Sequence, residues 1–581
     1  MAARPGYPLL SAIVGALTGL SQLGVTSVLS LVLAPLMALG VGAFARAGLG
    51  TDRWTWVVTV ATAGVIVGPT HLTGENLSNA LNIALEIGAL TPLAFAVGGG
   101  RGVLACGALL VASGMAHWDF LALFEAVLAV AFVLALPSSR RDSAAGVPPL
   151  RTEAGLIGVS AVVAGAIVAT LVGAVLRAPF KTIEIGNDRV LFRRKLRTDV
   201  ARLVVPETAA LLAPAVLPAL TTPGARLASA RQRRFALHAV SAWTYVMAAG
   251  IVLGALTLVV PPARFLAHLV VLPGALAVGA LLARGGSWLA GRTRVRATAG
   301  VLVVVALAAL AVPAVLRWYR YPVLMDPRAL QQAETAGRYV DGLPPHQAVV
   351  FLVGYEGGKP GVYGPVMSER TIRIGMPAAR AVDVHLFVGA PADLLAGRRT
   401  PPPDARAAQA TGQYWEDVRA LLPAHPPVLV LEATAPMEFA QAVGEGAPVI
   451  GPGVALLRGP APPSPLPSAP LPREVPSLWA GLVLGLAVLL LLAVAGMGWT
   501  ALALPARSDP AVFVSLTPVV GTGALILGGL AASLLGVRPS GPGAVATYAV
   551  VVAAGAVLGL VDRARRRRRE HRGGPGGSSQ T

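Results

Sequence analysis

Residues 478–504 read LWAGLVLGLAVLLLLAVAGMGWTALAL and contain no charged side chain. A helix rises about 1.5 Å per residue, so a run of this length can cross the roughly 30 Å hydrocarbon core of a bilayer. The rest of the chain has the same character, since 55% of its 581 residues are hydrophobic and 13% are charged. A soluble protein is about 25% charged. Because a soluble core cannot bury this much apolar surface, the sequence predicts an α-helical polytopic membrane protein.

Apolar segments of this kind recur from one end of the chain to the other. We expect about 13 to 14 transmembrane helices, at 25–45, 55–69, 79–98, 101–115, 119–137, 154–176, 202–220, 237–260, 263–283, 297–316, 478–504, 511–536 and 541–561, with 8–21 as a shorter membrane or interfacial helix. Residues 202–220 contain Pro214 and Pro218 and could form a broken or re-entrant helix.

The pattern changes between residues 317 and 477. A polar helix at 328–341 is followed by strand-like segments at 348–353, 382–388 and 427–432, with a further helix at 404–421. Short apolar strands separated by helices predict a small α/β domain with a largely parallel sheet. The predicted organisation is an N-terminal membrane block (1–220), further membrane helices (221–316), the α/β domain (317–458), a Pro-rich semi-rigid linker (459–477), a C-terminal three-helix membrane block (478–561) and a basic disordered tail (562–581).

The formal net charge of +19 is distributed in short basic clusters between apolar stretches. This distribution follows the positive-inside rule and does not indicate a nucleic-acid partner. The Arg-rich tail is therefore expected in the cytoplasm of a cell-envelope protein, and alternation of the helices places 317–477 outside. The same alternation puts four Arg-bearing loops inside, at 46–53, 140–151, 226–234 and 284–296. The basic loop 177–202 is the exception, because it falls outside.

Polar side chains gather around the third and fourth predicted spans. The sequence His71-Leu-Thr-Gly-Glu75-Asn76 lies at their outer turn, and Glu75, Asn79, Asn82 and Glu86 then follow at spacings that place them on one helix face. Ionisable groups within a span usually face a bundle interior or a wet cavity. The alternative is that the two asparagines hold helices together and Glu75 only begins a helix.

A second polar group, His117-Trp118-Asp119, lies at the next outer turn, with Glu125 slightly deeper. Together with His71 and Glu75 it could form a site for a general base or a divalent cation. The alternative is that His117 and Trp118 anchor the interface and Asp119 caps a helix. No spacing here is specific to a metal. The lone Cys106 excludes a disulfide within the chain and argues against a cysteine metal site.

The exceptional basic loop carries Arg193, Arg194, Lys195 and Arg197. Guanidinium groups present paired donors to phosphate oxygens, so the loop could hold a lipid-linked phosphate or pyrophosphate. The alternatives are binding of anionic headgroups without catalysis and a membrane topology that differs at this loop. The loop from Gly354 to Gly358 matches no nucleotide motif and is interpreted as a turn, while His385 is interpreted as a structural residue in a strand.

The layout over about residues 7–202 resembles the GT-C class of membrane glycosyltransferases, which use polyprenyl-phosphate sugar donors. The segment from Tyr7-Pro-Leu-Leu to Gly19-Leu20 is similar to the end of that class's first external loop, and His71 to Asn76 falls where several families carry a second acidic motif. Ala116-His117 resembles a small-residue and histidine feature, and the basic loop falls where such enzymes bind lipid phosphate. The chain departs from the class in lacking an initial helix and the acid that follows it.

The resemblance implies an enzyme acting on lipid-linked sugars at the outer face, with Glu75 or Asp119 as the base and the arginines of the basic loop on the donor phosphate. His71 and His117 would lie beside the base, and Asn79, Asn82 and Glu86 would contribute to substrate binding. Two alternatives remain open. One is a transporter or flippase of a lipid or anionic solute, and the other is a membrane scaffold whose α/β domain binds a partner.

Overall fold

The computed structural model describes residues 5–71, 77–175, 205–220, 228–257, 265, 268–289, 327–344, 347–352, 383–387, 425–469, 476–506, 508–537 and 541–572. The chain forms two compact units. We call them the helical unit (28–170, 191–319 and 477–581) and the α/β unit (1–27, 171–190 and 320–476).

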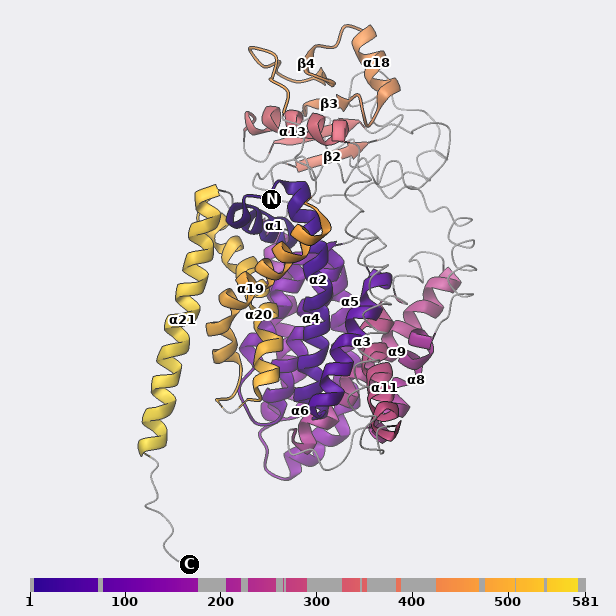
Figure 1. The fold of residues 1–581 in the computed structure, drawn as a ribbon, viewed down its shortest axis with the longest axis vertical. Coiled ribbons are helices and arrows are strands. Elements are labelled where there is room, and N and C mark those ends of the chain that lie inside the picture. The colour runs from indigo at the N-terminus through magenta and orange to yellow at the C-terminus, as the bar shows by residue number, and fades with distance from the viewer. Residues whose placement is uncertain are drawn as a thin grey trace, which may run out of the picture. The chain divides into compact units, whose positions relative to one another are not determined.

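The helical unit is made of long apolar helices (Figure 1). In the part of the chain that the structure describes, eight helices are long and apolar enough to cross a membrane. The elements are α2 (Gln22–Phe44), the π-helical turn η1 (Ala45–Leu49), α3 (Arg53–His71), α4 (Leu77–Val97), α5 (Val103–Ala144), the 3-10 turn η2 (Pro149–Arg151), α6 (Glu153–Val175), α8 (Val205–Leu220), α9 (Ala230–Thr257), the π-helical turn η3 (Val270–Gly274), α11 (Ala275–Leu289), α19 (Leu478–Ala503), α20 (Pro510–Leu534) and α21 (Gly541–Arg572). The expected segments that fall on described residues are confirmed as apolar helices, whereas the number of 13 to 14 membrane spans stays a prediction. The segment expected at 297–316 lies outside the described residues.

Three helices differ in detail from the expected segments. The two spans expected at 101–115 and 119–137 are joined as α5, which breaks at His117, where φ is −163° and ψ is 91°. α8 is helical throughout its length although Pro214 and Pro218 lie inside it. α21 continues to Arg572, into the segment expected to be a disordered tail. Arginine is a strong helix former, and the ion pair of Asp562 with Arg566 joins successive turns.

Within the helical unit, the last three helices pack on one another, and α20 packs on α4 and α5. Gly496 of α19 and Gly521 of α20 face each other so closely that a Cβ on either would collide with the backbone of the other helix. A Cβ on Gly88 of α4 would lie 2.5 Å from the side chain of Val519 in α20. Small residues allow this close approach between apolar helices. The predicted C-terminal block is therefore part of one compact unit with the N-terminal helices.

The α/β unit contains a five-stranded sheet in the order β2-β1-β3-β5-β4. β1 (Ala348–Leu352), β2 (Asp383–Phe387) and β3 (Val428–Leu431) are parallel, and they confirm the three strands expected from the sequence. β4 (Val449–Gly451) and β5 (Val454–Arg458) form an antiparallel hairpin that the sequence analysis missed. The unit also contains α1 (Gly6–Thr18), α13 (Pro327–Asp341) and α18 (Pro436–Gly444).

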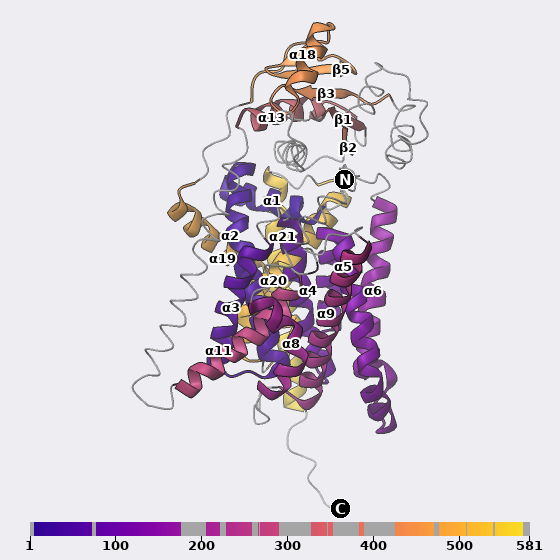
Figure 2. The ribbon, with the colours of Figure 1, turned by 90° about the vertical axis from the view of Figure 1, so that its right-hand side faces the viewer.

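Helix α13 covers one face of this sheet (Figure 2), and its position confirms the helix expected at 328–341. Its buried side chains, Ala333, Ala336, Tyr339 and Val340, meet strand residues such as Phe351 in one hydrophobic core.

The Pro-rich segment after β5 is attached to the same helix. Tyr339 donates a hydrogen bond to the carbonyl of Pro460 over 3.0 Å, and Gln331 donates one to the carbonyl of Ala469 over 2.6 Å. Residues 460–469 thus lie against the α/β unit, where the sequence analysis expected a linker.

Candidate functional site

A cluster of buried polar side chains joins α4 to α5. Asn82 and Ser113 are fully buried, and Glu86 is 2% exposed. The Asn82 amide donates hydrogen bonds to the Ser113 hydroxyl over 2.6 Å and to the Ser113 carbonyl over 3.1 Å. The Ser113 hydroxyl in turn donates to a Glu86 carboxylate oxygen over 3.3 Å. We call these three residues, with His117, the polar cluster. Their bonds satisfy groups that would be costly to leave unpaired in an apolar interior.

His117 belongs to the cluster through its backbone. Its carbonyl lies 3.4 Å from the Asn82 amide nitrogen, at the point where α5 breaks. Because the amide has two hydrogens and three acceptors, this longer hydrogen bond shares a hydrogen with a bond to Ser113. Irregular backbone at membrane depth is tolerated where neighbouring side chains satisfy the released groups. The contact links α4 to the break in α5, two residues before Asp119.

Three buried polar atoms near the cluster are not fully satisfied. Among the described residues, Asn79 Oδ1, Asn82 Oδ1 and Glu125 Oε1 have no hydrogen-bond partner. Asn79 lies one turn before Asn82 in α4 and is 8% exposed. Glu125 faces α6, where a Cβ on Gly165 would lie 3.9 Å from Glu125 Oε1. Buried polar atoms usually have a partner, so these three are points at which a substrate, water or ion could bind.

An aromatic stack extends from the polar cluster toward α9. The rings of His117 and Phe120 lie 4.3 Å apart in an edge-to-face arrangement, and Phe120 stacks on His268 at 4.6 Å. The indole of Trp243 donates to the His268 carbonyl over 2.9 Å. Ser113 and His268 were not predicted from the sequence. A serine inside an apolar helix gives no distinctive signal, and nothing in the sequence places His268 beside His117.

The structure brings together only some of the residues expected at the site. Asn82, Glu86 and His117 meet in the polar cluster, and Asn79 lies on the same buried side of α4. His71 ends α3, but its side chain lies outside the described residues, as does that of Asp119 in α5. The other expected residues lie wholly outside the described part of the chain; they are Glu75, Arg193, Arg194, Lys195 and Arg197, together with the loop 354–358.

Ion pairs between described residues of the helical unit lie at the ends of these helices opposite the polar cluster. Glu153 at the start of α6 is fully buried and binds Arg234 over 3.1 Å and His238 over 2.6 Å. Arg234 also binds Asp142 over 3.0 Å. Arg101 binds Asp562 over 2.6 Å. These groups share one end of the unit, because Gly98 contacts Gln232 and Gly100 contacts Pro505. We call this end the charged face.

The pair between Arg46 and Asp509 belongs to the charged face as well. The two groups are 2.7 Å apart, with side chains 4% and 19% exposed, and Asp509 also caps α20 by accepting from the Ala511 N–H. Burial acts to raise the pKa of Asp509. The hydrogen bonds from Arg46 and Ala511 and the charges of Arg46 and Arg53 outweigh it, so the pKa lies below its usual value.

Within the described residues, no group of three or more His, Cys, Asp or Glu side chains could hold a metal ion. The fold thus defines a class: a bundle of apolar helices of membrane-spanning length with a separate α/β unit, which is compatible with a multi-pass membrane protein. Comparison with models of known protein families gives no match, and none of the curated proteins compared with the chain matches it.

Proposed function

We propose that the chain is a multi-pass membrane protein of GT-C type that transfers a sugar from a polyprenyl-phosphate donor at the outer face of the membrane. The observation that supports this is the hydrogen bond from Asn82 to the His117 carbonyl. It ties the second turn of α4 to the break in α5. Glu75 precedes α4 by two residues and Asp119 follows the break by two, so both acids belong to chain segments that flank this contact.

In the proposed reaction, Glu75 or Asp119 accepts the proton of the acceptor hydroxyl, with His71 and His117 close to the base. The acceptor oxygen bonds to the anomeric carbon of the donor sugar, and the bond from that carbon to the phosphate oxygen breaks. The leaving lipid phosphate carries away the electron pair and is held by Arg193, Arg194, Lys195 and Arg197 of the basic loop. Asn82 and Glu86 position the α5 turn, because their hydrogen bonds are used within the polar cluster.

The test is sugar transfer by the purified chain in liposomes that contain a polyprenyl-phosphate sugar. Glu75→Ala and Asp119→Ala are compared with Glu432→Ala, which removes an exposed acid of the α/β unit. We expect at least one of the first two variants to lose transfer, while the third retains it. Transfer that is unchanged in both Glu75→Ala and Asp119→Ala would overturn the assignment.

The orientation that we propose places the charged face in the cytoplasm and residues 317–477 outside. Its support is that the arginines of four loops and the end of α21 agree with the positive-inside rule. Since Cys106 is the one cysteine, a Cys106→Ser background allows single cysteines at Ser368 and Ser579. An impermeant thiol reagent added outside should label the first and not the second, and the reverse pattern would contradict the orientation.

A second candidate function is transport or flipping of a lipid or anionic solute. It is favoured by the unsatisfied atoms of Asn79, Asn82 and Glu125 inside apolar helices, because polar groups at this depth often mark a pathway. Flux into proteoliposomes that falls in Glu125→Gln, without sugar transfer by the parent chain, would favour this candidate over the enzyme.

A further inference from the structure

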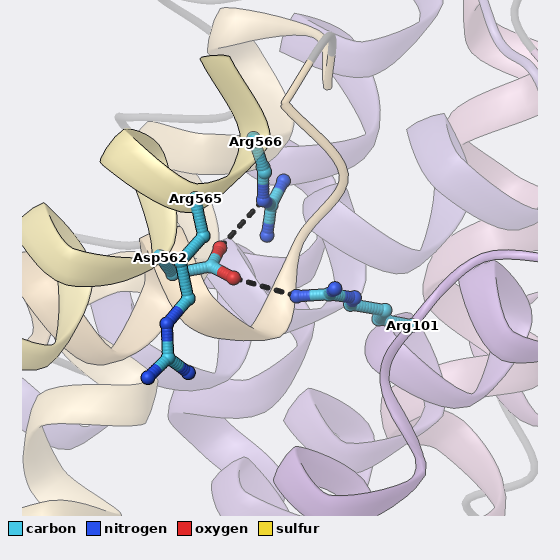
Figure 3. A pocket seen from close by; sticks show the side chains of 4 residues that line it. All are labelled: Arg101, Asp562, Arg565 and Arg566. Atoms are coloured by element: carbon cyan, nitrogen blue, oxygen red, sulfur yellow. Dashed lines mark hydrogen bonds and ion pairs between the residues drawn. The ribbon is translucent and has the colours of Figure 1, made fainter. Parts of the chain in front are cut away.

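The charged face contains a hollow where α21 meets the turn between α4 and α5. It is lined by Arg101, Asp562, Arg565 and Arg566. Figure 3 shows the guanidinium groups of Arg101 and Arg566 directed at the carboxylate of Asp562, while that of Arg565 lies apart from both. The three guanidinium groups and one carboxylate give the hollow a formal charge of +2. The single carboxylate compensates one of the three positive charges, so the hollow remains positively charged.

The arginines that line the hollow are engaged to different degrees. Arg566 binds Asp562 over 2.5 Å and also lies 3.4 Å from the carbonyl of Leu504, so it is part of the packing between α21 and the end of α19. Arg101 binds the other carboxylate oxygen, although its side chain is 56% exposed. Arg565 is exposed, and no described residue pairs with it. Arg565 thus retains its donors for a ligand, and Arg101 lines the same hollow.

The position of the hollow along α21 corresponds to the level of the lipid phosphates. Arg565 lies about 36 Å along the helix from Gly541, at about 1.5 Å per residue, whereas the hydrocarbon core is about 30 Å thick. The turns of α21 that precede it expose apolar side chains, with Val557 58% exposed and Leu560 63% exposed. An acyl chain can lie on this apolar surface while its phosphate reaches the arginines.

We infer that this hollow is a binding site for the phosphate of an anionic glycerophospholipid, with Arg565 and Arg101 as the donors and the exposed side of α21 as the contact for the acyl chains. Paired guanidinium donors fit phosphate oxygens. The ligand carries one negative charge or more and so compensates the positive charge of the hollow. Asp562 holds Arg101 and Arg566 in place, which makes it a positioning residue. The site is independent of the sugar-transfer reaction.

The experiment uses the full chain in detergent with phosphatidylglycerol or phosphatidylcholine added, and counts bound lipid by native mass spectrometry. The variant is Arg565→Gln, and its matched control is Arg563→Gln, which removes another exposed charge from the same turn without lining the hollow. We expect phosphatidylglycerol affinity to fall about tenfold in Arg565→Gln, the ratio that corresponds to the ~1.5 kcal/mol that a hydrogen bond to a charged group contributes, and to change much less in Arg563→Gln. Arg565→Lys should recover part of the lost affinity.

Two results would overturn the inference. Equal losses of phosphatidylglycerol in Arg565→Gln and Arg563→Gln would mean that only the general charge of the helix end matters. Inorganic phosphate that competes fully with phosphatidylglycerol at millimolar concentration would mean that the hollow binds free phosphate and the apolar side of α21 contributes nothing. Selective loss in Arg565→Gln, with phosphatidylglycerol bound in preference to phosphatidylcholine, supports the lipid site.

Discussion

Replacing Asp509 by Asn tests the importance of the ion pair between the N-cap of α20 and Arg46 in η1. The change leaves the Arg46 guanidinium, which is 4% exposed, without its carboxylate. Breaking a buried pair from one side costs about 3–5 kcal/mol, and the 19% exposure of Asp509 places the expected loss near the lower limit. Asparagine can still cap α20 by accepting from Ala511, so no separate capping loss is added. We therefore expect the free energy of unfolding to fall by about 3 kcal/mol.

The assay is unfolding of the purified chain by SDS in mixed micelles, followed by circular dichroism. Asp52→Asn is the matched control, because Asp52 also caps a helix, accepting from the Thr55 N–H over 2.7 Å, but is exposed. It should change stability by less than about 0.5 kcal/mol. A second variant, Arg46→Met with Asp509→Asn, should recover most of the loss, since it removes the unpaired charge. Equal effects of Asp509→Asn and Asp52→Asn would refute the reasoning.

Three further outcomes follow from the same structure. Because the pKa of Asp509 is lowered in the folded chain, its contribution to stability is present above the unfolded pKa of about 3.9 and is lost as the pH falls through the folded value. The difference in stability between the parent chain and Asp509→Asn should therefore close on acidification from pH 7 toward 3. A difference that widens would contradict this. Asn82→Leu should lower the stability of the helical unit by about 1–2 kcal/mol in the same SDS assay, whereas Thr170→Ala, whose hydroxyl bonds only within its own helix, should have little effect. Burial raises the pKa of Tyr339 to about 12, so the difference between the alkaline absorbance titrations of the parent chain and Tyr339→Phe should appear near pH 12; a difference centred near pH 10 would contradict the buried position.

The parts of the fold that could be predicted are those that depend on the pattern of apolar and polar residues along a short segment. Apolar runs located the helices, and three short apolar segments located the parallel strands. The break in α5 was also visible, because His117, Trp118 and Asp119 interrupt an apolar run. The hairpin of β4 and β5 was missed, because its strands are short and follow a Gly-rich and Pro-rich context that is typical of loops.

The site was harder to predict because its contacts join segments that are distant in the sequence. The spacing of Asn79, Asn82 and Glu86 gave one helix face correctly, but no local signal identifies Ser113 as the partner of both Asn82 and Glu86. The ion pair of Arg46 with Asp509 could not be predicted either, because the chain has many arginines and nothing in the sequence shows which of them pairs with a given acid. The Pro-rich composition of 460–469 indicated an extended segment and gave no information about its contact with α13.

The ion pairs of the charged face also have a consequence for biosynthesis. Arg46 and Asp509 are separated by 463 positions, so at about 5–20 residues per second the carboxylate is made about 20–90 s after the guanidinium. Arg101 is likewise synthesised long before its partner Asp562. During this interval the early helices are already synthesised with cationic groups whose final partners do not exist. The nascent bundle must therefore keep that end hydrated, or in contact with the insertion machinery, until the last two helices arrive and close it.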